Sequence, residues 1–244
     1  MKDCFTYMFK SENSALNLSI FYVLIFAAVL VGNLAAMYNP INMFGELSPL
    51  FFVFIIMDII LLAFPCGYAI SCIKNINNNS NKLPDFEYKN IFFLGIKTLF
   101  SFAILSVIVC LIFYVLGLCS HFFVTNNLTS FAFIIAAISF LISLIISFML
   151  AAGFYKFAKT ESILSFINYP ELAKLIDKNV GNYFKYFIIY AILITITLIV
   201  KNTLFYIFNF MGYLGLILYT ASLSLMLLYT ILIFTKIVTK SIIE

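Results

Sequence analysis

The sequence predicts an all-α fold, a polytopic transmembrane helical bundle with six spans. Of its 244 residues, 64% are hydrophobic and only 10% are charged, and the mean hydropathy is +1.12. Soluble domains have about 45–50% apolar and about 25% charged residues. The apolar residues also gather into long runs, and a helix needs about 20 such residues to cross the hydrocarbon core of a bilayer. A water-soluble fold of this length has too little interior to bury so much apolar surface.

Six apolar runs are expected to cross the membrane, separated by mostly short polar segments. They are Leu18–Met37, Pro49–Cys72, Phe92–Leu116, Ser130–Phe154, Tyr186–Phe208 and Tyr213–Val238. The first run is longer than the apolar part of a typical cleaved signal peptide and lacks a clean A-x-A site, so we expect it to be retained. We interpret residues 1–244 as one integral membrane domain.

The distribution of lysine predicts the orientation of these spans. Every cationic residue of the chain is a lysine, and of the 14 lysines only Lys201 falls on the side opposite the two termini. Lysine-rich connections remain in the cytoplasm, so the sequence predicts a cell-membrane protein with both termini cytoplasmic. The expected partners are the lipid bilayer and either other membrane proteins or further copies of the chain. Because the lysines are spread over several connections, nucleic acid is not an expected partner.

Two segments outside the spans have amphipathic patterns. The N-terminal segment 1–17 places its apolar residues on one helical face and fits the headgroup layer, although a disordered tail is the alternative. In the segment 155–183, Thr160 is positioned to cap a short helix, and Pro170 suits the first turn of a second helix that Gly181 would end. The apolar stripe of this second helix consists of Leu172, Leu175 and Ile176. We expect it to lie on the membrane or on the bundle at the cytoplasmic side, the alternative being a simple connector.

One carboxylate lies inside a predicted span. Asp58 is about nine residues from the start of the second run, and a charge at this depth is costly, so it is a functional hypothesis. It could bind a proton or a cation, or pair with Lys201 toward the outer end of the fifth span. The alternative is a protonated or hydrogen-bonded Asp58 with a packing role. On the predicted outer face, Asn127 begins an Asn-Leu-Thr glycosylation sequon whose use depends on the host.

The sequence contains no pattern that predicts catalysis. Its five cysteines form no C-x-x-C pair, a single histidine is present, and no phosphate-binding P-loop occurs. We therefore expect neither an enzyme nor a cofactor or metal. A lipid-modifying enzyme would need convergent acids near the interface, and no spacing connects those that the cytoplasmic segments offer, which are Asp85, Glu87, Glu161 and Glu171.

A motif around the end of the second span carries a family resemblance. It contains Gly67, Tyr68, Lys74, Leu83, Pro84, Gly95 and Lys97. This pattern resembles the prokaryotic membrane-protein family catalogued as domain of unknown function 4013. That family has a Gly-Tyr at a span end, a basic turn, a Leu-Pro-acid-aromatic segment, and a Gly followed by Lys. Here the family's arginines and its Gly before Leu-Pro are missing, and Lys74 is the basic residue of the turn. The resemblance implies a membrane location and no particular activity.

We expect structural roles for the motif residues. Gly67 permits a close helix approach or a tight exit from the span, Tyr68 is expected to anchor at the interface, and Pro84 to fix an extended turn. The leading hypothesis is a non-enzymatic scaffold or envelope-associated membrane protein. The alternative is a small transporter or permease that uses Asp58.

Overall fold

The fold is a bundle of long α-helices, as the sequence predicts. The computed structural model describes residues 14–37, 49–78, 80, 83–208 and 211–243. Within these residues every regular element is helical, and six helices are long and apolar enough to cross a membrane. They are α2 (Ser14–Met37), α3 (Pro49–Asn77), α4 (Tyr88–Thr125), α5 (Thr129–Thr160), α7 (Val180–Phe208) and α8 (Gly212–Ile243). The chain is thus a multi-pass membrane protein.

Several helices extend beyond the predicted spans. Helix α4 has 38 residues and is therefore about 57 Å long, compared with about 30 Å for a hydrocarbon core. Its added turns contain polar residues such as Asn90 and His121, which lower the hydropathy without interrupting the helical hydrogen bonds. An apolar run therefore predicts the part of a helix that contacts lipid, but it does not predict where the helix begins and ends.

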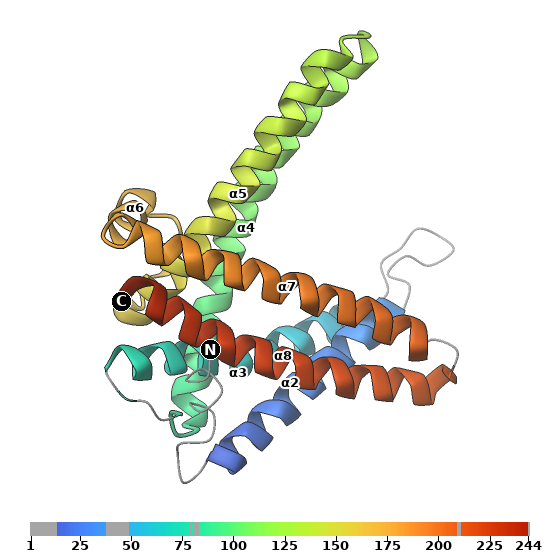
Figure 1. Cartoon of the computed structure of the whole chain (residues 1–244). Coiled ribbons are helices and arrows are strands. Elements are labelled where there is room, and N and C mark those ends of the chain that lie inside the picture. Colours follow the sequence, from blue (N-terminus) through green and yellow to red (C-terminus); the bar gives the residue numbers. More distant parts are fainter. Residues whose placement is uncertain (1–13, 38–48, 79, 81–82, 209–210, 244) are drawn as a thin grey trace.

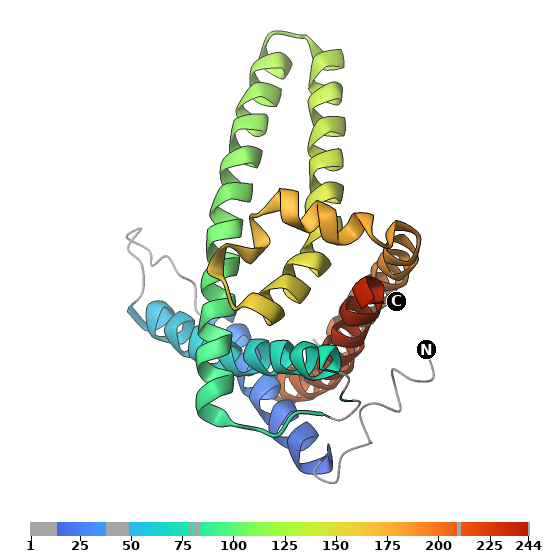
Figure 2. The same ribbon diagram turned by 90° about the vertical axis from the view of Figure 1, so that its left-hand side faces the viewer.

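The helices diverge from a common base. The C-terminal ends of α3, α5 and α8 and the starts of α4 and α7 gather on the left of Figure 1. From there the α4–α5 hairpin extends away from the other helices, as both views show (Figure 1, Figure 2). Large apolar side chains cover this outer half of the hairpin, among them Val107, Leu111, Phe133 and Leu141, which are all more than half exposed. Such a surface suits contact with lipid.

The best-packed part of the molecule lies at this base. One buried cluster includes Phe21, Tyr68, Leu83, Ile91 and Leu228, and so joins α2, α3, α4, α8 and the connection after α3. A second cluster contains Phe157, Phe166 and Val238, among others. Together these clusters fix the helix ends that carry most of the lysines.

The segment between α5 and α7 folds nearly as expected. A 3₁₀ turn, η2 (Ile163–Phe166), precedes α6 (Tyr169–Asp177), which has a proline in its first turn. The prediction that Thr160 caps this turn is wrong, because Thr160 is the last residue of α5 and the residue that precedes the turn is Ser162. The Thr160 hydroxyl lies 3.0 Å from that of Ser165. The prediction that Gly181 ends the second helix is wrong. Helix α6 already ends at Asp177, and Gly181 belongs to α7, which begins early because Tyr183 is buried against α5.

The amphipathic stripe of α6 faces the bundle. Leu172 and Ile176 are buried in a cluster with Ala152 and Tyr183, and Leu175 packs on the neighbouring cluster. Of the two placements that the sequence allowed for this helix, the structure has the one on the bundle. The predicted N-terminal amphipathic segment 1–17 lies outside the described residues, except for positions 14–17 at the start of α2.

Candidate functional site

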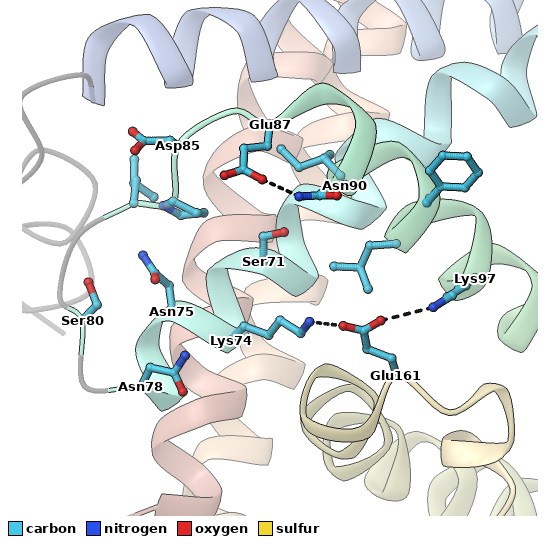
Figure 3. A pocket seen from close by; sticks show the side chains of 15 residues that line it. Ser71, Lys74, Asn75, Asn78, Ser80, Asp85, Glu87, Asn90, Lys97 and Glu161 are labelled. Carbon is cyan, nitrogen blue, oxygen red and sulfur yellow. Dashed lines mark hydrogen bonds and ion pairs between the residues drawn. The ribbon is translucent and has the colours of Figure 1, made fainter.

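A polar pocket of about 1000 Å³ lies where α3 ends and α4 begins (Figure 3). Its walls come from the last turns of α3, the connection to α4, the first turns of α4, and the end of α5. Four residues of the sequence motif line it, namely Lys74, Leu83, Pro84 and Lys97. Polar side chains complete the lining, which includes Ser71, Asn75, Asn78, Ser80, Asp85, Glu87, Asn90 and Glu161. The motif therefore describes a single site, although its members are up to thirty positions apart.

The two motif glycines bring the walls of this pocket together. A Cβ atom on Gly67 would lie 1.8 Å from the carbonyl oxygen of Ile91, and one on Gly95 would lie 1.6 Å from that of Ala63. No side chain fits such a gap, so α3 and α4 touch backbone to backbone at this crossing. Of the two roles that the sequence left open for Gly67, this is the close helix approach. The crossing fixes the position of Lys74 relative to Lys97.

The connection between α3 and α4 is held against the bundle. Leu83 is buried in the core cluster, and the carbonyl oxygen of Pro84 accepts hydrogen bonds from the Tyr68 hydroxyl at 3.3 Å and the Asn17 amide at 3.1 Å. Tyr68 has an exposed fraction of 0% and stacks on Phe86 with ring centroids 5.2 Å apart. The expected interfacial role for Tyr68 is therefore wrong. Its ring sits in the core because its hydroxyl finds a partner in the folded connection.

Glu161 joins three helices across the pocket. Its carboxylate pairs with Lys74 from α3, and its second oxygen lies 3.2 Å from the Lys97 ammonium of α4. Figure 3 shows both lysines reaching toward this carboxylate. The hydrogen bonds from Lys74 and Lys97 lower the pKa of Glu161 below its ordinary value. The group therefore remains ionised at neutral pH.

The backbone of Glu161 is unusual. It caps the end of α5 in the left-handed conformation with φ of 52°, which costs a residue with a side chain about 1–2 kcal/mol. Glycine or asparagine normally occupies this position. The conformation aims the carboxylate at the two lysines, which lie 87 and 64 positions away in sequence. Because of that separation, the sequence alone does not connect Glu161 with these lysines. The sequence has no glycine where α5 ends, and this absence indicates that a residue with a side chain adopts the left-handed conformation there.

The pocket offers both signs of charge. Asp85 and Glu87 lie across from the Lys74–Glu161–Lys97 group (Figure 3), and Glu87 accepts a hydrogen bond from the Asn90 amide. The amides and hydroxyls between them can donate and accept hydrogen bonds. The arrangement is suited to holding a polar group of a ligand or partner. Among the described residues, no group of three or more His, Cys, Asp or Glu side chains could hold a metal ion.

The two intramembrane candidates lie elsewhere. Asp58 is partly exposed in α3 and faces α2, where a Cβ on Gly32 would be 3.5 Å from its carboxylate. Lys201 is exposed on α7. Among the ion pairs of the described residues, none joins these two side chains, so the structure does not bring them together as the sequence suggested. Asn127 of the sequon lies in the turn between α4 and α5.

The comparisons with known proteins agree with the motif. The family described as protein of unknown function DUF4013 matches residues 50–206, and the chain belongs to this family. The matched range contains every residue that lines the polar pocket. No curated protein and no solved structure matches the chain.

Proposed function

We propose that this member of the DUF4013 family is a non-enzymatic scaffold of the cell membrane, and that its polar pocket docks a polar segment of a partner membrane protein. One observation carries this proposal. Glu161 pairs with both Lys74 and Lys97, so that side chains from three helices form one continuous rim. The rim belongs to the part of the chain that defines the family.

The construction of the pocket favours docking. Its walls are fixed by the backbone contact at Gly67 and Gly95, and its connection is held through the carbonyl oxygen of Pro84. A preorganised site loses little conformational entropy when a partner binds. The mixture of ammonium, carboxylate and amide groups selects a partner by its hydrogen-bond pattern and charge, which favours specific over non-specific binding.

The pocket belongs on the cytoplasmic side in this proposal. Lys74 and Lys97 are among the lysines that outnumber Lys201 by thirteen to one, and lysine-rich ends remain in the cytoplasm. With six spans, both termini then lie in the cytoplasm as well. The partner is another membrane protein or a second copy of the chain.

Site-specific photocrosslinking in living cells tests the docking proposal. A photoreactive amino acid replaces Asn78 or Asn90, which are exposed at the pocket, and in control variants it replaces Val107 or Leu111 on the outer part of α4. We expect discrete protein adducts from the pocket positions and none from the controls. The same adducts should weaken when Lys97 is replaced by glutamine. Lipid adducts alone, or equal protein adducts from all four positions, would refute docking at this pocket.

A second candidate function is transport, which one observation favours. Asp58 is partly exposed within a span and faces Gly32, and its charge is not balanced by Lys201. A carboxylate with this surrounding could exchange a proton or a cation. Proton or cation flux into vesicles that contain the purified chain distinguishes this function from a scaffold.

A further inference from the structure

A second pocket lies between the end of α5 and α6, apart from the proposed docking pocket. Its volume is about 350 Å³. Four lysines and one glutamate are its charged lining residues, so its net charge is positive. The lining consists of Tyr155, Lys156, Lys159, Thr160, Glu171, Lys174, Leu175 and Lys178. We refer to it as the basic pocket.

The fold holds these lysines together. Lys156 and Lys159 stand on the last turns of α5, and Lys174 and Lys178 stand at the end of α6. Helix α6 is fixed on α5 by the buried side chains of Leu172 and Ile176, and by an ion pair between Lys156 and Glu171. The side chain of Lys156 is only 11% exposed. Four like charges are thus kept close by packing, which costs free energy unless an anion is present.

Most of the positive charge is available to a ligand. The ion pairs of the described residues include Lys156, whereas Lys159, Lys174 and Lys178 take part in none of them and are exposed. Hydrogen bonding from Lys156 lowers the pKa of Glu171, so one negative charge remains against four positive charges at neutral pH. The basic pocket therefore favours an anion.

The surroundings of the basic pocket indicate that this anion belongs to a lipid. Helix α7 begins two positions after Lys178, and a row of exposed apolar side chains follows it at four-residue spacing. The row consists of Val180, Phe184, Ile188, Ile192 and Ile196. A headgroup held by the lysines would place its acyl chains beside this row, along a helix apolar enough to cross the membrane. Basic pockets next to membrane helices on the cytoplasmic side bind anionic headgroups in this way.

We propose that the basic pocket binds the headgroup of an anionic phospholipid, with its phosphate oxygens held by Lys159, Lys174 and Lys178. Each lysine near a membrane surface contributes about 1 kcal/mol to such binding, which corresponds to about a fivefold change in affinity. Replacement of all three should therefore weaken binding about 100-fold.

Native mass spectrometry of the full chain in detergent tests this proposal. The protein is titrated with phosphatidylglycerol, with phosphatidylcholine, and with phosphatidylglycerol in the presence of inorganic phosphate. We expect the anionic lipid to bind at least tenfold more tightly than the zwitterionic one. The triple variant K159Q/K174Q/K178Q should lose this preference, whereas the control variants Lys89→Gln and Lys201→Gln, at exposed lysines outside the basic pocket, should keep it.

Several outcomes would overturn the proposal. Equal affinity for both lipids, or an equal loss in the control variants, would show that the basic pocket does not select anionic headgroups. Competition by millimolar inorganic phosphate would show a site for a soluble anion. If the triple variant does not fold, the single variants Lys159→Gln, Lys174→Gln and Lys178→Gln decide the question, because each should weaken phosphatidylglycerol binding about fivefold whereas Lys89→Gln should not.

Discussion

Replacement of Gly95 by alanine is expected to separate α3 from α4 and to disrupt the docking pocket. The added Cβ would lie 1.6 Å from the carbonyl oxygen of Ala63, whereas a carbon and a carbonyl oxygen approach to about 3.3 Å at closest. The backbones must then move apart by about 1.7 Å. Overpacking typically costs about 1–3 kcal/mol. Because backbone lies on both sides of this contact and no side chain can rotate away, we expect about 3 kcal/mol or more.

The matched control is Gly117→Ala in the same helix. A Cβ at Gly117 would meet no atom within 4 Å, and alanine favours a helix over glycine by about 1 kcal/mol. Thermal unfolding in detergent, followed by circular dichroism, should show Gly95→Ala well below the wild type and Gly117→Ala unchanged or higher. An unfolding temperature of Gly95→Ala equal to that of the wild type would refute the backbone contact between α3 and α4.

Four further predictions concern Glu161, Asp58 and the orientation of the chain. Glu161→Gly should unfold at a higher temperature than Glu161→Ala, because both lose the lysine pairs but only glycine relieves the left-handed backbone, a difference of about 1 kcal/mol. In an acid titration of the wild type, the stability that Glu161 contributes should be complete above the ordinary pKa of glutamate and should decline below it, since pairing lowers the pKa of this group. Asp58→Asn should abolish any proton or cation flux into vesicles if the protein transports, and a variant with undiminished flux would exclude this carboxylate as the carrier. In a variant whose five cysteines are replaced by serine, an impermeant maleimide should label Asn127→Cys on intact cells and Asn78→Cys only after permeabilisation. The reverse pattern would contradict cytoplasmic termini.

The sequence was informative about the fold because the bilayer imposes a simple rule. A helix that crosses lipid must be apolar along about 20 residues, so all six spans were visible as runs. Hydropathy does not predict the ends of α4 and α5, because backbone hydrogen bonds and packing stabilise their terminal turns. The same reasoning placed Tyr68 at the interface, because its burial depends on Pro84 and Phe86 in a connection that folds back over it.

The candidate site was predictable only in part. The motif indicates the part of the site between Gly67 and Lys97, because a family resemblance is recognised from residues that are close in sequence. The sequence offers Glu161 only as one of several cytoplasmic acids, because its role depends on a contact between helix ends far apart in the chain. Asp58 is a candidate because a charge inside the membrane is costly in free energy. In the structure its carboxylate lies beside Gly32 of α2, whereas the polar pocket lies at the helix ends.

The two pockets share the end of α5, which leads to a last prediction. Thr160 lines the basic pocket, and its neighbour Glu161 lines the docking pocket. A headgroup in the basic pocket would hold the last turn of α5, and with it the left-handed backbone that aims Glu161 at Lys74 and Lys97. Addition of phosphatidylglycerol to the purified chain should therefore raise the unfolding temperature of the wild type more than that of Glu161→Gly, which has lost the lysine pairs. Equal increases in both proteins would show that the pockets are independent, because the lipid would then stabilise α5 and α6 alone.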